Sequence, residues 1–227
     1  MKAIWGFTTA LLVGVSGCAT GPAIPDVTED GLQRVTISGV DAAYVRPGAD
    51  LKKYHKIMLD PVQVAFDPDW DPKRTGSTLK LSTEDRERIR SELAELFMEV
   101  FSKELTRDGG AQLVTTAGPD VLRLSTGLAN VYLNAPDTNE PGRSRVYVMS
   151  AGSATLVAEV RDSESGAIIG RLFDHREASN TGMLQWSDSV MNSAEARRTF
   201  TRWAQILRQR FDAVRNAPAT APVATPG

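Results

Sequence analysis

Long stretches in which apolar and polar residues alternate are the feature that most limits how this chain can fold. Residues 121–133 and 145–161 both follow the pattern, and residues 162–166 (DSESG) have the composition of a hairpin turn that leads into residues 167–178. An alternating stretch fits a strand with one buried face. The three strands therefore predict an antiparallel meander, one face of which must be covered by other parts of the chain.

Two amphipathic helices are expected to supply that cover. Apolar residues recur every three or four positions between Ser82, a residue type that caps helices, and the glycines at 109–110. A second such stretch covers residues 193–215, where Asn192 and Glu195 have the spacing of a capping pair. The sequence thus predicts an α+β fold, with a mostly antiparallel sheet and two long amphipathic helices packed on one face.

Two short apolar runs, residues 55–59 and 62–66, are separated by Pro61. Proline cannot donate a backbone hydrogen bond to a neighbouring strand, so it is confined to edges and bulges of a sheet. We therefore expect a strand that is interrupted or bent at Pro61.

The composition fits one domain of ordinary size. Cys18 is the only cysteine, so the chain cannot form an internal disulfide and its stability must come from a hydrophobic core. Hydrophobic residues make up 41% of the chain, which is enough for a single core in residues 34–215. The formal net charge of −2 argues against a nucleic-acid-binding surface, which needs clustered excess Lys and Arg.

The start of the chain has the layout of a secretory signal. Lys2 precedes an apolar run that is too short to span a bilayer as a stable helix, and small residues follow it. The last four residues of this stretch, Val15-Ser16-Gly17-Cys18, resemble the lipobox of bacterial lipoproteins. That resemblance implies cleavage before Cys18, a diacylglyceryl group on its sulfur, and usually an acyl chain on the new amino terminus.

This start divides the chain into four parts. We expect a signal peptide at residues 1–17, the lipidated Cys18 with a flexible tether to residue 33, a single α+β domain at 34–215, and a disordered Ala/Pro/Thr tail at 216–227. Thr20 stands where an aspartate would favour the inner membrane in the proteobacterial lipoproteins that this start resembles. Its presence favours the outer membrane, with the domain facing the periplasm, over the inner membrane.

Five stretches of the chain carry a family resemblance. They are residues 54–69 (YHKIMLDPVQVAFDPD), 81–85 (LSTED), 118–122 (GPDVL), 150–155 (SAGSAT) and 159–178 (EVRDSESGAIIGRLFDHREA). Together they resemble a family of uncharacterised bacterial lipoproteins, the domain of unknown function 3313 group. The likeness extends over roughly residues 40–212. It implies a family but no catalytic residues.

No catalytic or metal site is expected. A calcium loop that begins at Asp67 would need glycine at its sixth position, where Pro72 stands, and glutamate at its twelfth, where Thr78 stands. Trp70 beside Asp69 is instead a candidate contact for a partner, because exposed aromatic side chains often anchor interfaces. Local burial of the Trp70 ring is the alternative.

Two further residues are candidate partner contacts. Met183 and Trp186 are more apolar than the polar loop around them requires, and long loops in compact domains often carry function.

For an enzyme, the strongest candidates are Asp174, His175 and Glu177, although alternation along a strand would place Asp174 on the face opposite the other two. No serine or cysteine stands in a recognisable nucleophile motif near them.

We therefore expect a non-enzymatic, lipid-anchored envelope domain that has no cofactor and binds an envelope protein or a cell-wall polymer, but no nucleic acid. Two alternatives stay open. One is an envelope hydrolase that uses Asp174, His175 and Glu177. The other is a subunit of a secretion or pore assembly. It rests on a looser likeness to the sheet-plus-helix domains of outer-membrane accessory lipoproteins, which activate cell-wall synthases or assemble secretion channels.

Overall fold

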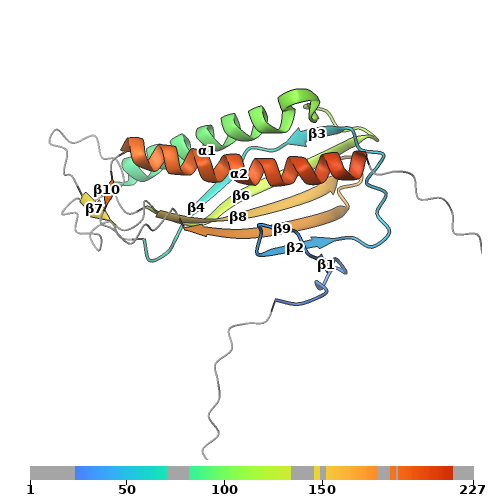
Figure 1. Cartoon of the computed structure of the whole chain (residues 1–227), viewed down its shortest axis with the longest axis horizontal. Coiled ribbons are helices and arrows are strands. Elements are labelled where there is room, and N and C mark those ends of the chain that lie inside the picture. The colour runs from blue at the N-terminus through green and yellow to red at the C-terminus, as the bar shows by residue number, and fades with distance from the viewer. Residues whose placement is uncertain are drawn as a thin grey trace, which may run out of the picture.

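The computed structural model describes residues 24–70, 82–133, 146–148, 152–177, 185–187 and 189–216. Two helices, α1 (Thr83–Thr106, green) and α2 (Ser189–Arg215, red), lie side by side on one face of a twisted sheet (Figure 1). The strands are β1 (Gln33–Val35), β2 (Ala42–Val45), β3 (Lys56–Leu59), β4 (Gln63–Phe66), β5 (Gln112–Leu113), β6 (Val121–Leu133), β7 (Val146–Val148), β8 (Gly152–Asp162), β9 (Ile168–Glu177) and β10 (Gln185–Ser187). A short 3-10 helix, η2 (Arg107–Gly109), follows α1.

The main sheet is mixed rather than mostly antiparallel. Its strand order is β1-β2-β9-β8-β6-β3-β5, and β4 also pairs with β6. The predicted meander is present, because β6 pairs antiparallel with β8 and β8 with β9. However, β3 and β4 pair parallel with β6, and β5 pairs parallel with β3. The helix α1 carries the chain from β4, beside the second half of β6, back to the end of the sheet where β3 begins. The strand β5 then runs in the same direction as β3, because such a crossover produces parallel neighbours.

The interruption at Pro61 separates two strands that share one partner. Lys56–Leu59 pairs with the start of β6, whereas Gln63–Phe66 pairs with its second half. The register along β4 shifts between Val64 and Phe66, which marks a bulge or similar irregularity. Pro61 therefore lies at a bend between two strands, as the sequence predicts.

The strand predicted for residues 145–161 is divided in two. β7 pairs with β10 in a separate small sheet, and β8 begins only at Gly152. Gly152 has a φ of 152°, and a Cβ at this position would lie 2.3 Å from the carbonyl oxygen of Tyr132. Only glycine fits this close approach of two backbones, so the long strand starts there.

The two helices begin in different ways. At α1, the Ser82 hydroxyl accepts a hydrogen bond of 3.0 Å from the Asp85 backbone N–H, and the Asp85 carboxylate accepts one of 3.1 Å from the Ser82 N–H. This capping box confirms the predicted start of α1. In contrast, α2 begins at Ser189, so the capping pair predicted at Asn192 and Glu195 is wrong and lies within the helix.

The main core lies between the helices and the sheet. Phe97 and Phe101 of α1 are stacked with ring centroids 3.8 Å apart, and Phe200 of α2 contacts Phe97 edge-on at 5.2 Å. These rings pack on buried side chains of the central strands, among them Leu128 and Leu156. Aromatic packing therefore fixes the two helices against each other and against the sheet.

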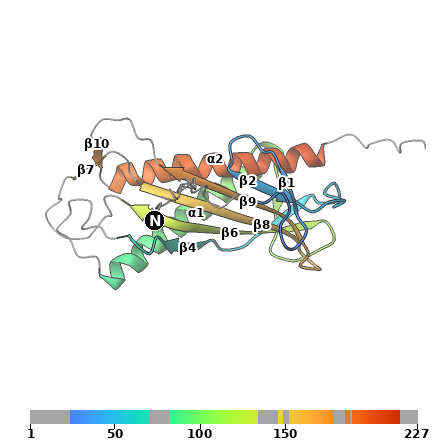
Figure 2. The ribbon, with the colours of Figure 1, turned by 90° about the horizontal axis from the view of Figure 1, so that it is seen from below.

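A smaller core covers part of the opposite face. Figure 2 shows the strands from below, in front of the helices, with β1 and β2 near one end of the sheet. Leu32 is fully buried there and packs with Tyr44 of β2 and Phe173 of β9. The Tyr44 hydroxyl also donates a hydrogen bond of 3.0 Å to the carbonyl of Pro25. Residues 24–33, predicted as part of a flexible tether, thus belong to the folded body.

Candidate functional site

The residues suggested for a hydrolase do not assemble. Asp174 is fully buried on the helix-facing side of β9, whereas His175 and Glu177 are exposed. The His175 ring lies 3.1 Å from the Thr155 hydroxyl, on the other face of the sheet. An acid that orients a catalytic histidine must contact it, and Asp174 cannot do so across the backbone. The alternation predicted for this strand is confirmed, and this catalytic arrangement is wrong.

Asp174 instead joins the two layers of the fold. Its carboxylate accepts a hydrogen bond of 2.7 Å from the indole N–H of Trp203 in α2 and one of 2.6 Å from Nε of Arg176. Arg176 also donates to the carbonyl oxygen of Gly39, in the loop between β1 and β2. A buried charge needs such partners, so this carboxylate is structural.

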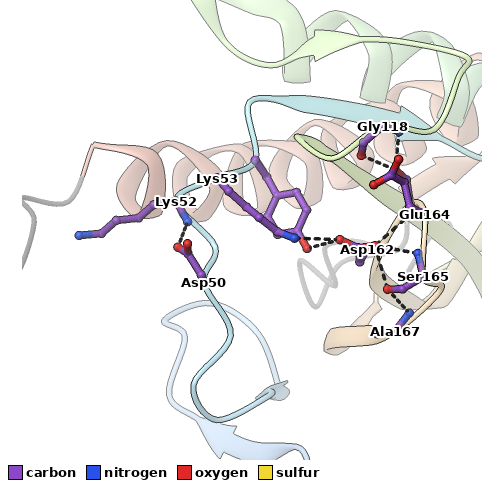
Figure 3. A network of polar contacts seen from close by, with 10 residues as sticks. Asp50, Lys52, Lys53, Gly118, Asp162, Glu164, Ser165 and Ala167 are labelled. Carbon is purple, nitrogen blue, oxygen red and sulfur yellow. Dashed lines mark hydrogen bonds and ion pairs between the residues drawn. The ribbon is translucent and has the colours of Figure 1, made fainter.

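A second carboxylate, Asp162, organises the turn between β8 and β9 (Figure 3). One of its oxygens accepts hydrogen bonds from the backbone N–H and the hydroxyl of Ser165, both 2.8 Å long. The other accepts from the Tyr54 hydroxyl at 2.7 Å and from the Lys53 ammonium at 3.1 Å. Residues before β3 are thereby attached to the end of the hairpin.

These contacts shift the ionisation of the cluster. The hydrogen bonds from Ser165 and Tyr54 favour the charged form of Asp162 and lower the pKa of its carboxyl well below its usual range. The hydrogen bond to Asp162 raises the pKa of Lys53, while burial raises the pKa of Tyr54. Each group is thus held in its ordinary charge state at neutral pH, which suits a structural junction rather than proton transfer.

Trp70 is buried, so its predicted role as an exposed partner contact is wrong. It is 2% exposed, and its ring stacks on Phe66 with centroids 4.4 Å apart. The indole N–H donates a hydrogen bond of 2.9 Å to the carbonyl of Leu133, and Arg86 lies over the ring. The alternative weighed from the sequence, local burial, is what the structure shows. Phe66, four residues earlier, was the available signal.

Among the other predicted site residues, only Asp69 has a side chain in the described part of the structure. Asp69 is exposed beside Trp70, and its side chain remains a candidate contact. Trp186 lies in β10, whose backbone pairs with Tyr147, but its side chain is outside the described part of the structure. Met183 and Cys18 both lie outside the described residues.

In the described ranges, no three His, Cys, Asp or Glu side chains come together in a way that could hold a metal ion. Neither of the described helices has a stretch apolar enough to cross a bilayer.

The structure also contains an apolar cavity that no pattern in the sequence indicates. It has a volume of about 330 Å³ and lies between the sheet and the C-terminal half of α2. Its floor includes Ala43 of β2 and Ala158 of β8, and its roof includes Leu207 and Phe211. Small side chains beneath a helix leave space, but only the strand order brings these distant residues together.

The family model for proteins of unknown function termed DUF3313 matches residues 27–207. The chain belongs to this family. The match covers almost all of the folded body, and the predicted family resemblance is therefore confirmed. No curated protein matches this chain.

Several solved structures resemble the fold of this chain at low sequence identity. Protein XCC0632 from Xanthomonas campestris is 11% identical with a TM-score of 0.38, over 74% of this chain and 93% of that one. A PelC dodecamer from Paraburkholderia phytofirmans is 9% identical with a TM-score of 0.34, over 73% and 96%. A minor lipoprotein from Acinetobacter baumannii is 14% identical with a TM-score of 0.31, over 71% and 95%.

Replacing Trp203 by Phe should weaken the fold more than replacing Trp70 by Phe. Both changes remove an indole N–H, but W203F takes a donor from a buried carboxylate and should lower the free energy of unfolding by about 1.5–3 kcal/mol. W70F removes a bond to a neutral carbonyl and should cost about 0.5–1.5 kcal/mol. Urea unfolding of the two variants measures the difference, and equal losses would contradict the role given to Asp174.

Replacing Asp162 by Asn should destabilise the protein in a pH-dependent way. The pKa of this carboxyl is lowered in the folded state, so its contribution is present above pH ~4 and is lost as the pH falls towards the folded-state pKa. We expect D162N to lower the free energy of unfolding by about 1.5–3 kcal/mol at pH 7. The deficit should shrink in acid. E164Q, which changes an exposed side chain on the same turn, is the control and should leave the free energy of unfolding at pH 7 nearly unchanged.

Proposed function

We propose that this protein is a lipid-anchored lipoprotein of the cell envelope, whose folded domain is a non-enzymatic binding or accessory module. The lipobox-like sequence that ends at Cys18 supports the anchor. An anchor at this position would hold the domain close to the membrane, because residues 18–23 reach no further than roughly 20 Å even when fully extended. The outer membrane, with the domain facing the periplasm, is the proposed location.

The observation that carries the binding role is the separation of Asp174 from His175. Hydrolysis by a triad requires a nucleophile, a base and an orienting acid in mutual reach. Here the buried acid is occupied by Trp203 and Arg176, and the exposed histidine lies beside a threonine. The same hydrogen bonds that make Asp174 unsuitable for catalysis make the sheet and α2 a firm support for a binding surface.

Labelling with radioactive palmitate tests the anchor. Full-length protein expressed in a bacterium with lipoprotein-processing enzymes should take up label and fractionate with membranes, whereas C18A should be unlabelled. S16A keeps a small residue in the lipobox-like sequence and should still be labelled. An unlabelled wild-type protein, or label that persists in C18A, would contradict the proposal.

Photo-crosslinking in intact cells tests the binding role. A photo-reactive amino acid in place of exposed Asp69 should yield a crosslinked species with an envelope protein or with cell-wall polymer. The same group in place of Glu164, which is exposed on the turn after β8, is the control. The absence of any specific product at position 69, or identical products at both positions, would count against a partner surface beside Trp70.

A further inference from the structure

The helix α2 buries the middle of its apolar stripe more completely than the part that follows. Phe200, Trp203 and Ala204 are 3%, 1% and 0% exposed. Further along the same stripe, Leu207 and Phe211 are only half-buried, and both line the cavity. These two side chains still pack against the edge of the core, and they also cover a hollow.

The floor of the cavity is lined by small residues of three adjacent strands. Ala43 in β2, Gly170 in β9 and Ala158 in β8 all line it. A Cβ at Gly170 would lie 2.9 Å from the carbonyl oxygen of Tyr44, so a larger residue there would require β2 to move. The small residues of these three strands therefore leave the space that forms the cavity.

Two hydrogen bonds attach the C-terminal half of α2, which forms the roof of the cavity, to the end of α1. Arg208 donates a hydrogen bond of 3.4 Å to the carbonyl of Glu104 in α1, and Arg215 donates one of 3.4 Å to the carbonyl of Gly110. Both bonds tie the C-terminal half of α2 to the end of α1 rather than to β2 or β9. This attachment positions the C-terminal half of α2 beside α1, above the small residues of β2, β8 and β9.

The size and walls of the cavity suit a slender apolar ligand. Its volume of about 330 Å³ is at the lower end of the range of roughly 300–1,000 Å³ typical of ligand pockets. Water is a poor occupant, because an ordered water needs two to four polar partners and the lining is almost entirely aliphatic and aromatic. A single hydrocarbon chain would fill the space without leaving polar groups unsatisfied.

One positive charge at the edge of the cavity has no counter-ion. The two cations of the lining are Arg171 and Arg210. Arg171 is neutralised by Glu159 at 2.8 Å and Asp30 at 2.9 Å. Arg210 is exposed, and within the described part of the chain its guanidinium has no hydrogen bond or ion pair. An apolar hollow beside an unpaired arginine is complementary to an amphiphile with an anionic head.

We propose that this cavity binds a long-chain fatty acid, with its hydrocarbon chain between α2 and the sheet and its carboxylate at Arg210. The inference goes beyond the proposed envelope role and does not depend on lipidation of Cys18. Failure of palmitate labelling would remove the anchor and leave this site standing.

Photo-labelling of the full chain in an unfractionated cell lysate tests the site, because the protein is then present whether or not Cys18 is lipidated. A long-chain fatty acid that carries a photo-reactive group is added, and the adducts are mapped by mass spectrometry of peptides. We expect adducts with the mass of the free acid on peptides from β2 or from the C-terminal half of α2. V45F, which places a larger side chain in the cavity, should lose most of this labelling. V157F makes the same change on the opposite face of the sheet and should retain it.

A second pair of variants tests the head group without touching the core. R210Q should reduce labelling at low probe concentration about fivefold, as expected for one exposed ion pair. R202Q changes another exposed arginine of α2 that does not line the cavity, and should label like the wild type. Because both side chains are exposed, this comparison holds even if V45F fails to fold.

Several results would overturn the proposal. They are the absence of adducts from the cavity peptides, equal labelling of R210Q and R202Q, and equal labelling of a folded V45F and V157F. Adducts with the mass of an intact phospholipid would assign the cavity to a different lipid. Loss of the probe adducts, together with α2-to-α2 links between two copies after treatment with a bifunctional crosslinker, would assign the cavity to an interface between chains.

Discussion

The buried carboxylate of Asp174 is the contact on which the rest of the structure depends. It joins the sheet to α2 through the Trp203 indole, and through Arg176 it reaches the loop before β2. Breaking a buried ion pair by removing one partner commonly costs about 3–5 kcal/mol, because the remaining charge is left without compensation. Together with the aromatic packing of Phe200 against α1, the bond from Asp174 to Trp203 fixes the middle of α2 over the sheet.

The two halves of α2 therefore have different surroundings. Around Trp203 the helix is clamped to the sheet and packed against the aromatic rings of α1. Beyond Leu207 it is tied sideways to the end of α1 by Arg208 and Arg215, above a floor of small residues. These contacts hold this half of the helix beside α1, and the small residues below it leave the cavity unfilled.

Local patterns in the sequence predicted the local structure well. Alternation located β6 and β9, the Ser82 capping box located the start of α1, and Pro61 marked the bend between β3 and β4. The parallel pairing of β3 with β6 was missed, because it depends on where a helical crossover returns the chain. The division of the strand at Gly152 was missed because it depends on the approach of Tyr132, twenty residues earlier.

The candidate site was harder to predict than the fold. Alternation alone indicated that Asp174 and His175 point to opposite faces, and the structure bears this out. The burial of Trp70 in an acidic loop depends on contacts with Phe66 and Leu133 that composition does not reveal. The cavity required knowledge that Ala43, Ala158 and Gly170 lie on adjacent strands, which no local pattern contains.

Hydrogen exchange along α2, measured on the purified full chain with and without a long-chain fatty acid, is the most direct test of this division of the helix. Amides near Trp203 should exchange slowly in both conditions, because they open only with the clamped core. Amides of residues 207–214 should exchange faster without the fatty acid and become protected when it is added. Uniform exchange along α2 that the fatty acid leaves unchanged would contradict both the clamp at Asp174 and the ligand site beyond it.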